Sequence, residues 1–408
     1  MTHPRTDTEV VVTGLGMVTP AGCDRESTWS AIRAGRTSAA PDPALAGLPI
    51  TLSCRVPDLV GDRPILHGAG SAYLDPVARF ALAAVAEALE HAGLGPQSWD
   101  GGRVAVVVGS GLGGLTTQDT ALASLAEGGA GSVSPYFHPG YLINMAGAQI
   151  ALRLHITGPG LTVSTACASG ATAIGVARDL LAAGSCDLAL ACGAEAGISR
   201  LTVAGFTQLG ALSPRGSRPF DTDRDGFVIG EGAAALVLER ADHAAARGVR
   251  PLARLLGYGA STDAFHVVAP HPRGEGAQTA ILCALTDAGV MPRQVDHVNA
   301  HGTSTPDNDR IEAAVLGRLF PHRPPVTSSK GVTGHSLGAA GAIEAALTVL
   351  AIRDGVIPPT AGTEHITPTI DADADIVTRT ERPVPVRTAL TNSFGFGGHN
   401  AVLVLAAP

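Results

Sequence analysis

The feature that most limits the fold of this chain is an alternation of short β-branched runs with long segments rich in alanine and leucine. Short apolar runs are typical of buried strands, and longer ones of helices that cover them. The sequence therefore predicts an α/β protein with largely buried sheets. We expect strands at Val10–Thr13, Val104–Gly109, Leu161–Thr165, Leu188–Cys192, Ala234–Glu239, Val295–Ala300, Val326–Ser328 and Val402–Ala406, and helices at Pro76–Ala92, Ala168–Ala183, Gly276–Ala288, Asp309–Leu319 and Ala339–Arg353.

Two of the expected helices, Ala168–Ala183 and Ala339–Arg353, resemble each other. Each follows a strand end that contains serine or threonine, and each is apolar nearly all round, as in a helix between two layers. Any alanine-rich buried helix would share these properties, so the likeness is weak evidence of a duplication. On this basis we expect two halves, residues 1–250 and residues 251–408.

Charge and cysteine content argue against several classes of function. The net charge is -8 and no basic block is present, which gives no indication of nucleic-acid binding. The first residues lack the pattern of a signal peptide, and no apolar run approaches the ~18 residues of a membrane helix. Six cysteines without CxxC spacing predict neither a disulfide framework nor a metal site. We therefore expect a cytoplasmic protein with no metal and no cofactor.

One segment, VSTACASG at residues 163–170, places a cysteine between a strand and a helix. At the start of a helix, unsatisfied N–H groups and the helix dipole lower a thiol pKa and favour the thiolate. The same N–H groups can stabilise an oxyanion. Cys167 is therefore a candidate nucleophile, although a packed core cysteine explains the segment equally well.

A second segment, NAHGTSTPDND at residues 299–309, delivers His301 from a strand to a glycine-containing turn. Thr303 and Thr305 offer hydroxyl groups beside it, and Asp309 could cap the next helix. A single histidine in such a place is more often structural than catalytic.

A third segment, SSKGVTGHSLGAAG at residues 328–341, carries His335 and Lys330, the single lysine of the chain. A charged Glu344 in the apolar helix that follows needs a partner, and Lys330 is a plausible one, directly or through His335. A structural ion pair would look the same.

The fourth segment, NSFGFGGHN at residues 392–400, is a glycine-rich turn that places Phe394 and Phe396 beside exposed N–H groups. It could be an ordinary tight loop, and it matches neither dinucleotide- nor phosphate-binding pattern. Together, the four segments offer a nucleophile, acid/base groups and oxyanion donors at strand ends.

In these four motifs and their order, the sequence resembles the β-ketoacyl-acyl-carrier-protein synthases, the condensing enzymes of fatty-acid and type II polyketide synthesis. The resemblance spans nearly the whole chain, from VVTGLGMVTP at residues 11–20 to Asn400, with support from SRPFDTDRDGF at residues 217–227 and GEG at 230–232. It implies the thiolase fold, two duplicated halves in five layers α-β-α-β-α, and usually a dimer.

The resemblance also implies roles. Cys167 would accept the acyl group, and His301 and His335 would assist decarboxylation of a malonyl-acyl-carrier-protein extender. Lys330 would organise His335, with Glu344 behind it. The N–H groups of Cys167 and Phe396 would form the oxyanion hole, and Phe396 would act as a gate. The substrate-binding candidates are Thr303 and Thr305 for the pantetheine arm, and Leu112, Phe206 and Phe394 for the pocket.

Some residues depart from the family pattern or leave the pathway open. Val268 stands where many relatives have threonine, which removes a hydrogen bond to the pantetheine arm. Ser336 is common in polyketide members, whereas residues 165–168 look like the fatty-acid type. The expected partner is a separate acyl carrier protein, and the assembly a homodimer or a heterodimer with a related subunit.

Four alternatives compete with an autonomous acyltransferase. The chain could be active only in a heterodimer, or be a non-catalytic chain-length partner, although such partners usually lack the cysteine that Cys167 supplies. A coenzyme-A-dependent thiolase would need a second cysteine, and Cys283 lies outside the motifs. An unrelated thiol hydrolase is a further alternative.

Overall fold

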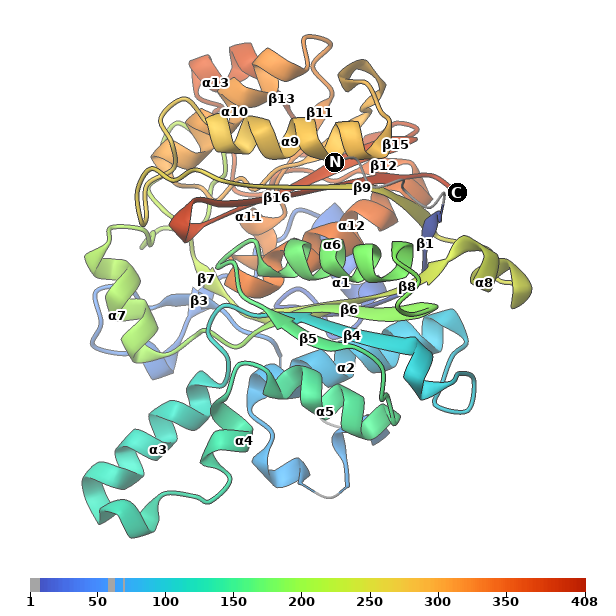
Figure 1. Ribbon diagram of the computed structural model, residues 1–408. Helices are drawn as coiled ribbons and strands as arrows, with labels where there is room; N and C mark the ends of the chain where they lie inside the picture. The colour runs from blue at the N-terminus through green and yellow to red at the C-terminus, as the bar shows by residue number, and fades with distance from the viewer. Residues whose placement is uncertain (1–7, 58–62, 69) are drawn as a thin grey trace.

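The computed structural model describes residues 8–57, 63–68 and 70–408 (Figure 1). Residues 1–7, on which the expectation of no signal peptide partly rests, lie outside this description. Within the described part of the chain, no helix is both long and apolar enough to cross a membrane.

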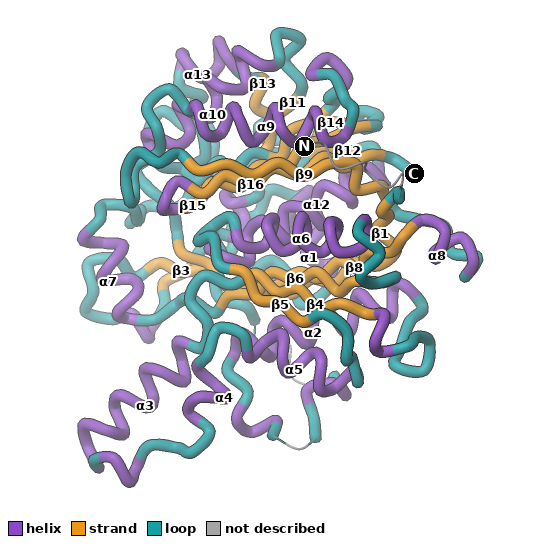
Figure 2. The backbone as a smooth tube through the Cα atoms, viewed as in Figure 1, coloured by secondary structure: helices purple, strands orange, loops and turns teal. Residues whose placement is uncertain are grey.

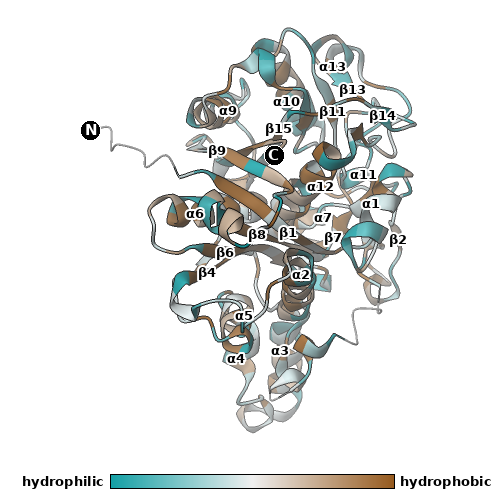
Figure 3. Ribbon diagram, turned by 90° about the vertical axis from the view of Figure 1, so that its right-hand side faces the viewer, coloured by the Kyte–Doolittle hydropathy of each residue, from teal (hydrophilic) through white to brown (hydrophobic). Residues whose placement is uncertain are grey.

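The first half of the chain supplies five main strands in the order β5-β4-β6-β8-β1. These are β1 (Val10–Val18), β4 (Val104–Gly109), β5 (Gly160–Val163), β6 (Leu188–Glu195) and β8 (Gly232–Arg240). Strand β4 is parallel to β5 and β6, whereas β8 is antiparallel to both β6 and β1. All residues of β6 are buried, and β6 and β8 are predominantly brown in Figure 3.

The second half repeats this topology in the order β11-β10-β15-β16-β9. Its strands are β9 (Ala253–Thr262), β10 (His297–Asn299), β11 (Pro325–Thr327), β15 (Thr388–Gly395) and β16 (His399–Ala406). Strand β10 is parallel to β11 and β15, and β16 is antiparallel to β15 and β9. Each half therefore has the same strand order and the same strand directions.

The two sets of strands join through their first strands, because β1 pairs with β9 at Val11–Arg254 and Val12–Ala253. With the short β13 (Asp375–Ile376) beside β11, the described residues form one eleven-stranded sheet. In space it makes two strand layers, one above the other (Figure 2).

Helices fill the remaining three of the five layers seen among the described residues (Figures 1 and 2). The expected α-β-α-β-α arrangement is therefore confirmed. The central layer contains α6 (Ser169–Ala182) and α12 (Ala340–Asp354); the outer layers contain α2 (Pro76–Ala92) and α5 (Met145–Leu154) on one side, and α9 (Glu275–Ala288) and α10 (Pro306–Leu319) on the other.

Helices α6 and α12 pack directly against each other, as expected from their apolar sequences. In α12 every residue from Ala340 to Ile352 is buried, which places the helix in the main core together with residues of β1, β6, β8 and β16. The core therefore combines side chains from both halves of the chain.

All eight expected strands and all five expected helices are present, with ends shifted by a few residues. The expectation omitted β9 and β15, and also α1 (Arg25–Arg33), α3 (Leu115–Gly128), α5 and α7 (Arg200–Gln208). The shorter elements are β2 (Ala40–Pro41), β3 (Leu52–Cys54), β7 (Ile229–Gly230), β12 (Val356–Ile357), β14 (Arg382–Pro383), α4 (Phe137–Tyr141), α8 (Ala241–Ala246), α11 (Lys330–Thr333) and α13 (Pro368–Asp373).

Candidate active site

Cys167 lies in the turn between β5 and α6, and only 8% of its surface is exposed. The preceding Ala166 has φ +50°, a left-handed conformation that costs a non-glycine residue about 1–2 kcal/mol. Two hydrogen bonds hold this turn, from Ala168 N–H to the Thr165 carbonyl and from the Thr165 N–H to Ser169 Oγ. The turn thus holds the thiol at the beginning of the buried helix.

The glycine-rich loop after β15 packs against this turn. A Cβ atom at Gly395 would lie 2.5 Å from the Thr165 carbonyl oxygen and 3.1 Å from the Cys167 nitrogen. Only glycine allows this approach. It brings the Phe396 N–H within hydrogen-bonding range of the thiol, and the N–H of Cys167 itself is also within that range. Two backbone donors therefore converge on the reactive sulfur.

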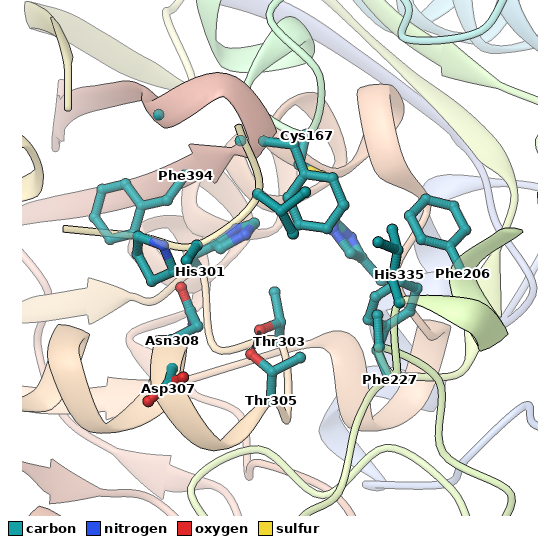
Figure 4. A pocket seen from close by; sticks show the side chains of 18 of the residues that line it. Cys167, Phe206, Phe227, His301, Thr303, Thr305, Asp307, Asn308, His335 and Phe394 are labelled. Carbon is teal, nitrogen blue, oxygen red and sulfur yellow. Dashed lines mark hydrogen bonds between the residues drawn. The ribbon is translucent and has the colours of Figure 1, made fainter. Parts of the chain in front are cut away.

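The two histidines come from the second half of the chain. His301 follows β10 and His335 follows α11; each is 2% exposed. Their rings meet edge to face with centroids 5.4 Å apart. Among the described residues, the Nδ1 atoms of both rings have no hydrogen-bond partner. Figure 4 shows both rings beside Cys167 at one cavity.

Hydrogen bonds to the backbone fix the position of each histidine. The N–H groups of His301 and Gly302 donate to the two oxygens of Glu312, at 2.9 and 2.8 Å. The His335 N–H donates to the Val228 carbonyl at 2.8 Å, and a hydrogen bond also ties its carbonyl to β7. Glu312 lies in α10, within a segment recognised from sequence as a helix, but its role was not predicted.

Lys330 is buried and forms a direct ion pair with Glu344 of α12. Its Nζ also donates to the His301 carbonyl oxygen at 2.5 Å. The direct Lys330–Glu344 contact is one of the two arrangements that the sequence left open. The hydrogen bond of Lys330 goes to His301, whereas its effect on His335 is electrostatic.

Burial dominates the protonation states in the site. It raises the pKa of the Cys167 thiol to about 12, against the opposing effects of Lys330 and the two N–H groups. The expectation of a lowered thiol pKa is therefore wrong. Burial and the positive charge of Lys330 hold the pKa of His301 and of His335 well below 6.5. At neutral pH the thiol is protonated and both imidazoles are neutral.

One cavity connects these groups to the surface. Its lining includes the nucleophile candidate, both histidines and most of the predicted substrate-binding residues (Figure 4). The hydroxyl groups of Thr303 and Thr305 hydrogen-bond to each other at 2.8 Å along its wall. Predicted residues that line it are Cys167, Phe206, His301, Thr303, Thr305, His335, Phe394 and Phe396.

Three predicted residues lie outside this lining. Lys330 and Glu344 pair with each other, and Lys330 also donates to the His301 carbonyl oxygen. Leu112 packs against the apolar cluster that contains Cys167 and Leu337. Phe227 also lines the cavity, although it was not selected from the sequence. Its ring packs edge to face against the His335 ring, with centroids 5.1 Å apart.

The donors in the site do not resemble a metal centre. In residues 8–57, 63–68 and 70–408, no group of three or more His, Cys, Asp or Glu side chains could hold a metal ion. The five cysteines besides Cys167 are also free thiols. The chemistry of the cavity must therefore be argued from one thiol, two imidazoles and backbone donors.

Comparisons with known proteins agree with this arrangement. Models of the β-ketoacyl synthase N-terminal and C-terminal domains match residues 7–244 and 252–364. A 3-oxoacyl-[acyl-carrier-protein] synthase 2 of Rhizobium meliloti (strain 1021) is 42% identical, covering 97% of this chain and 98% of the relative.

Two solved structures are similar over 99% of this chain and 100% of their own. The ishigamide ketosynthase/chain length factor has a TM-score of 0.91 at 34% identity. A type II polyketide synthase acyl-carrier protein in complex with its ketosynthase, bound to the hexaketide, has a TM-score of 0.90 at 29% identity. The chain therefore belongs to the β-ketoacyl synthase family and has its five-layered thiolase fold.

Proposed function

We propose that this chain catalyses decarboxylative condensation of an acyl group, held on Cys167, with a malonyl thioester of an acyl carrier protein. The observation that carries the proposal is the meeting of a thiol, two neutral imidazoles and two backbone N–H donors in one cavity. The first half of the chain supplies the nucleophile, and the second half supplies the histidines and the Phe396 N–H.

In the first step the sulfur of Cys167 attacks the carbonyl carbon of the acyl thioester. Because its pKa is raised, the thiol must lose its proton during the attack, and a neutral imidazole relays that proton to the leaving pantetheine sulfur without persisting as imidazolium. The N–H groups of Cys167 and Phe396 stabilise the oxyanion. The bond to the pantetheine sulfur then breaks, and that sulfur leaves as a thiol with the proton.

In the second step a malonyl thioester enters the vacated arm site. The carbon–carbon bond to the carboxylate breaks, CO2 leaves, and an enolate forms. Hydrogen bonds from neutral His301 and His335 to the thioester oxygen stabilise this enolate. The enolate carbon attacks the acyl-cysteine, the bond to Cys167 Sγ breaks, and the sulfur takes up one proton from solvent. The product is a β-ketoacyl thioester, longer by one two-carbon unit.

The remaining predicted residues support these steps. The charge of Lys330 disfavours imidazolium at both histidines, and Glu344 balances that buried charge. Thr303 and Thr305 are placed to hold the pantetheine arm along the cavity wall. The ring centroids of Phe396 and Phe206 are 6.1 Å apart. Movement of the Phe396 side chain from this position would open or close the cavity.

We also propose a division of the chain near residue 250, supported by the repeated strand order on either side of it. A separate acyl carrier protein would supply both thioesters, as the complex of a related ketosynthase suggests. The free edge of β5, where Leu161 is 43% exposed, would pair with a second copy or with a related subunit. A cytoplasmic location fits the family.

The test is intact-protein mass spectrometry of the purified chain alone, mixed first with acyl thioesters of a carrier protein and then with the malonyl thioester. We expect an adduct on Cys167 that disappears with release of an extended β-keto product. The Cys167→Ala variant is the control. Elongation by that variant would refute the nucleophile assignment.

A heterodimer is the second candidate, because a ketosynthase/chain length factor is among the similar structures. If the chain alone forms no adduct with any donor but gains activity when mixed with a related subunit, this candidate replaces the autonomous enzyme. Retention of Cys167 argues against a non-catalytic partner.

A further inference from the structure

One buried carboxylate that the mechanism above does not use lies at the end of β6. Glu195 has no exposed surface, and its two oxygens accept four hydrogen bonds. Oε1 accepts from the Ser110 hydroxyl at 3.0 Å and from the Leu112 N–H at 3.1 Å. Oε2 accepts from the N–H groups of Gly111 at 2.7 Å and Gly338 at 3.0 Å.

These donors come from two segments that are far apart in the sequence. Residues 110–112 follow β4 in the first half, and Gly338 lies in the turn between His335 and α12 in the second half. A Cβ at Gly338 would lie 2.5 Å from the Gly111 nitrogen and 2.6 Å from Glu195 Oε2, so both segments are pressed against the carboxylate. Glu195 therefore joins the two halves beside the cavity.

The same two segments carry the leucines at the apolar end of the cavity. Leu337 lines the cavity beside Cys167, and Leu112 packs behind it. Their side chains meet at Gly197, where a Cβ would lie 3.0 Å from Leu337 Cδ1 and 3.2 Å from Leu112 Cδ1. Leu337 also has φ +46°, a strained conformation that the surrounding structure must maintain.

We propose that Glu195 is a positioning residue that sets how long an acyl chain the enzyme accepts, by holding Leu112 and Leu337 as the end wall of the acyl pocket. This inference rests on the proposed function, because it assumes that an acyl group on Cys167 extends toward Leu337. Without the carboxylate the wall loosens, and longer chains gain access.

The chemistry of the four donors favours the carboxylate over any neutral replacement. Each donor points at an oxygen, so an amide nitrogen in the same place would face an N–H group and break at least one hydrogen bond. A hydrogen bond to a charged acceptor is stronger than one to a neutral acceptor. Burial raises the pKa of Glu195 to about 7, so the rates are compared above pH 7, where the carboxylate predominates and losing one such bond changes an equilibrium by about tenfold or more. The Glu195→Gln variant therefore weakens the contact with residues 110–112 if the amide nitrogen replaces Oε1, or with both Gly111 and Gly338 if it replaces Oε2, with little change in volume.

The experiment measures the rate of Cys167 acylation by straight-chain acyl-carrier thioesters of increasing length, using intact mass on the full chain. For Glu195→Gln we expect the ratio of the rate with the longest donor to that with the shortest to rise about tenfold. The matched control is Glu87→Gln, a buried carboxylate that accepts the N–H groups of Met17 and Arg25 away from the cavity. It should leave the ratio unchanged.

An equal loss of rate with every donor, or an unchanged ratio, would overturn the proposal. So would a similar change of ratio in Glu87→Gln. Failure of the wild-type chain to become acylated by any donor, both alone and mixed with a related subunit, would instead refute the proposed function.

A second variant keeps the test decisive if Glu195→Gln does not fold. Gly197→Ala places a methyl group between Leu112 and Leu337 and leaves the carboxylate intact. We expect it to shift the preferred donor length. An unchanged length profile would show that these leucines do not end the acyl pocket, and the proposal would fall.

Discussion

At the cysteine, burial and hydrogen bonding act on the thiol in opposite directions, and burial wins. The pKa of Cys167 rises to about 12 although two N–H groups and Lys330 favour the thiolate. A thiol in this state is protonated at neutral pH, so it must give up its proton to a neighbouring imidazole as it attacks a substrate carbonyl. The reactivity of the site therefore depends on the neutral histidines as much as on the sulfur.

The histidines give a pH prediction. Burial and Lys330 keep the pKa of His301 and His335 well below 6.5, so acidification through pH 6.5 leaves both rings neutral. We expect the rate of CO2 release from the malonyl thioester to stay level as the pH falls through 6.5 and to decline only at lower pH. An acidic limb centred at the ordinary histidine pKa would contradict this electrostatic account.

The buried ion pair of Lys330 and Glu344 gives a stability prediction. Removing one partner of a buried pair leaves an uncompensated charge and typically costs about 3–5 kcal/mol. We expect Glu344→Gln to lower the free energy of unfolding by about that amount in a denaturant titration. As a control, Glu275→Gln removes an exposed pair with Arg273 and should change stability little. Similar small effects of both variants would count against the charge argument.

The sequence predicted the site residues better than their surroundings. Cys167, His301 and His335 are candidates because each lies where a recognisable strand or helix meets a polar turn, and the resemblance to the family supplies their expected roles. Glu195 and Glu312 could not be selected, because their partners are backbone N–H groups of distant segments. The expectation of a lowered thiol pKa was wrong for a related reason: a local argument from the helix end ignores the burial of Cys167 by segments that are distant in the sequence.

At the scale of elements, the site depends on close approach between turns. The loop after β15 reaches the cysteine turn only because Gly395 has no side chain. The same requirement explains why β9 was not expected. Its Gly257 and Gly259 interrupt the apolar pattern, yet they are what lets α9 lie directly on the strand, since a Cβ at either would collide with a carbonyl of that helix.

The Gly395 contact can be tested by adding one methyl group. In Gly395→Ala the Cβ would meet the Thr165 carbonyl and displace the loop that carries the Phe396 N–H. Since loss of one oxyanion donor typically costs 10²–10³ in rate, we expect acylation of Cys167 to slow by about that factor. Gly95→Ala, where a Cβ meets nothing within 4 Å, is the matched control and should keep full activity. A fully active Gly395→Ala enzyme would refute the role of this contact.

At the scale of the whole molecule, the repeated topology of the two halves does not make them independent. Helix α12 of the second half is buried in a core that it shares with β1, β6 and β8 of the first. The sequence could suggest a repeat from two similar helices, but not this mutual burial, which depends on how the layers stack.

The shared core predicts that the chain unfolds as one unit. We expect a single cooperative transition for residues 1–408 in calorimetry, and no cooperative transition for residues 1–250 expressed alone, because the apolar face that receives α12 would be exposed. Native-like unfolding of the isolated first half would show that the halves are stable separately.

The contribution of both halves to one cavity also has a consequence for synthesis. Chains emerge from the ribosome beginning at the N-terminus, so the Cys167 thiol is made well before His301 and His335. A nascent or truncated chain has neither the proton acceptors nor the Phe396 donor. Under the proposed mechanism, acylation of Cys167 therefore begins only after residues 301–396 have been synthesised and have folded onto the cysteine turn.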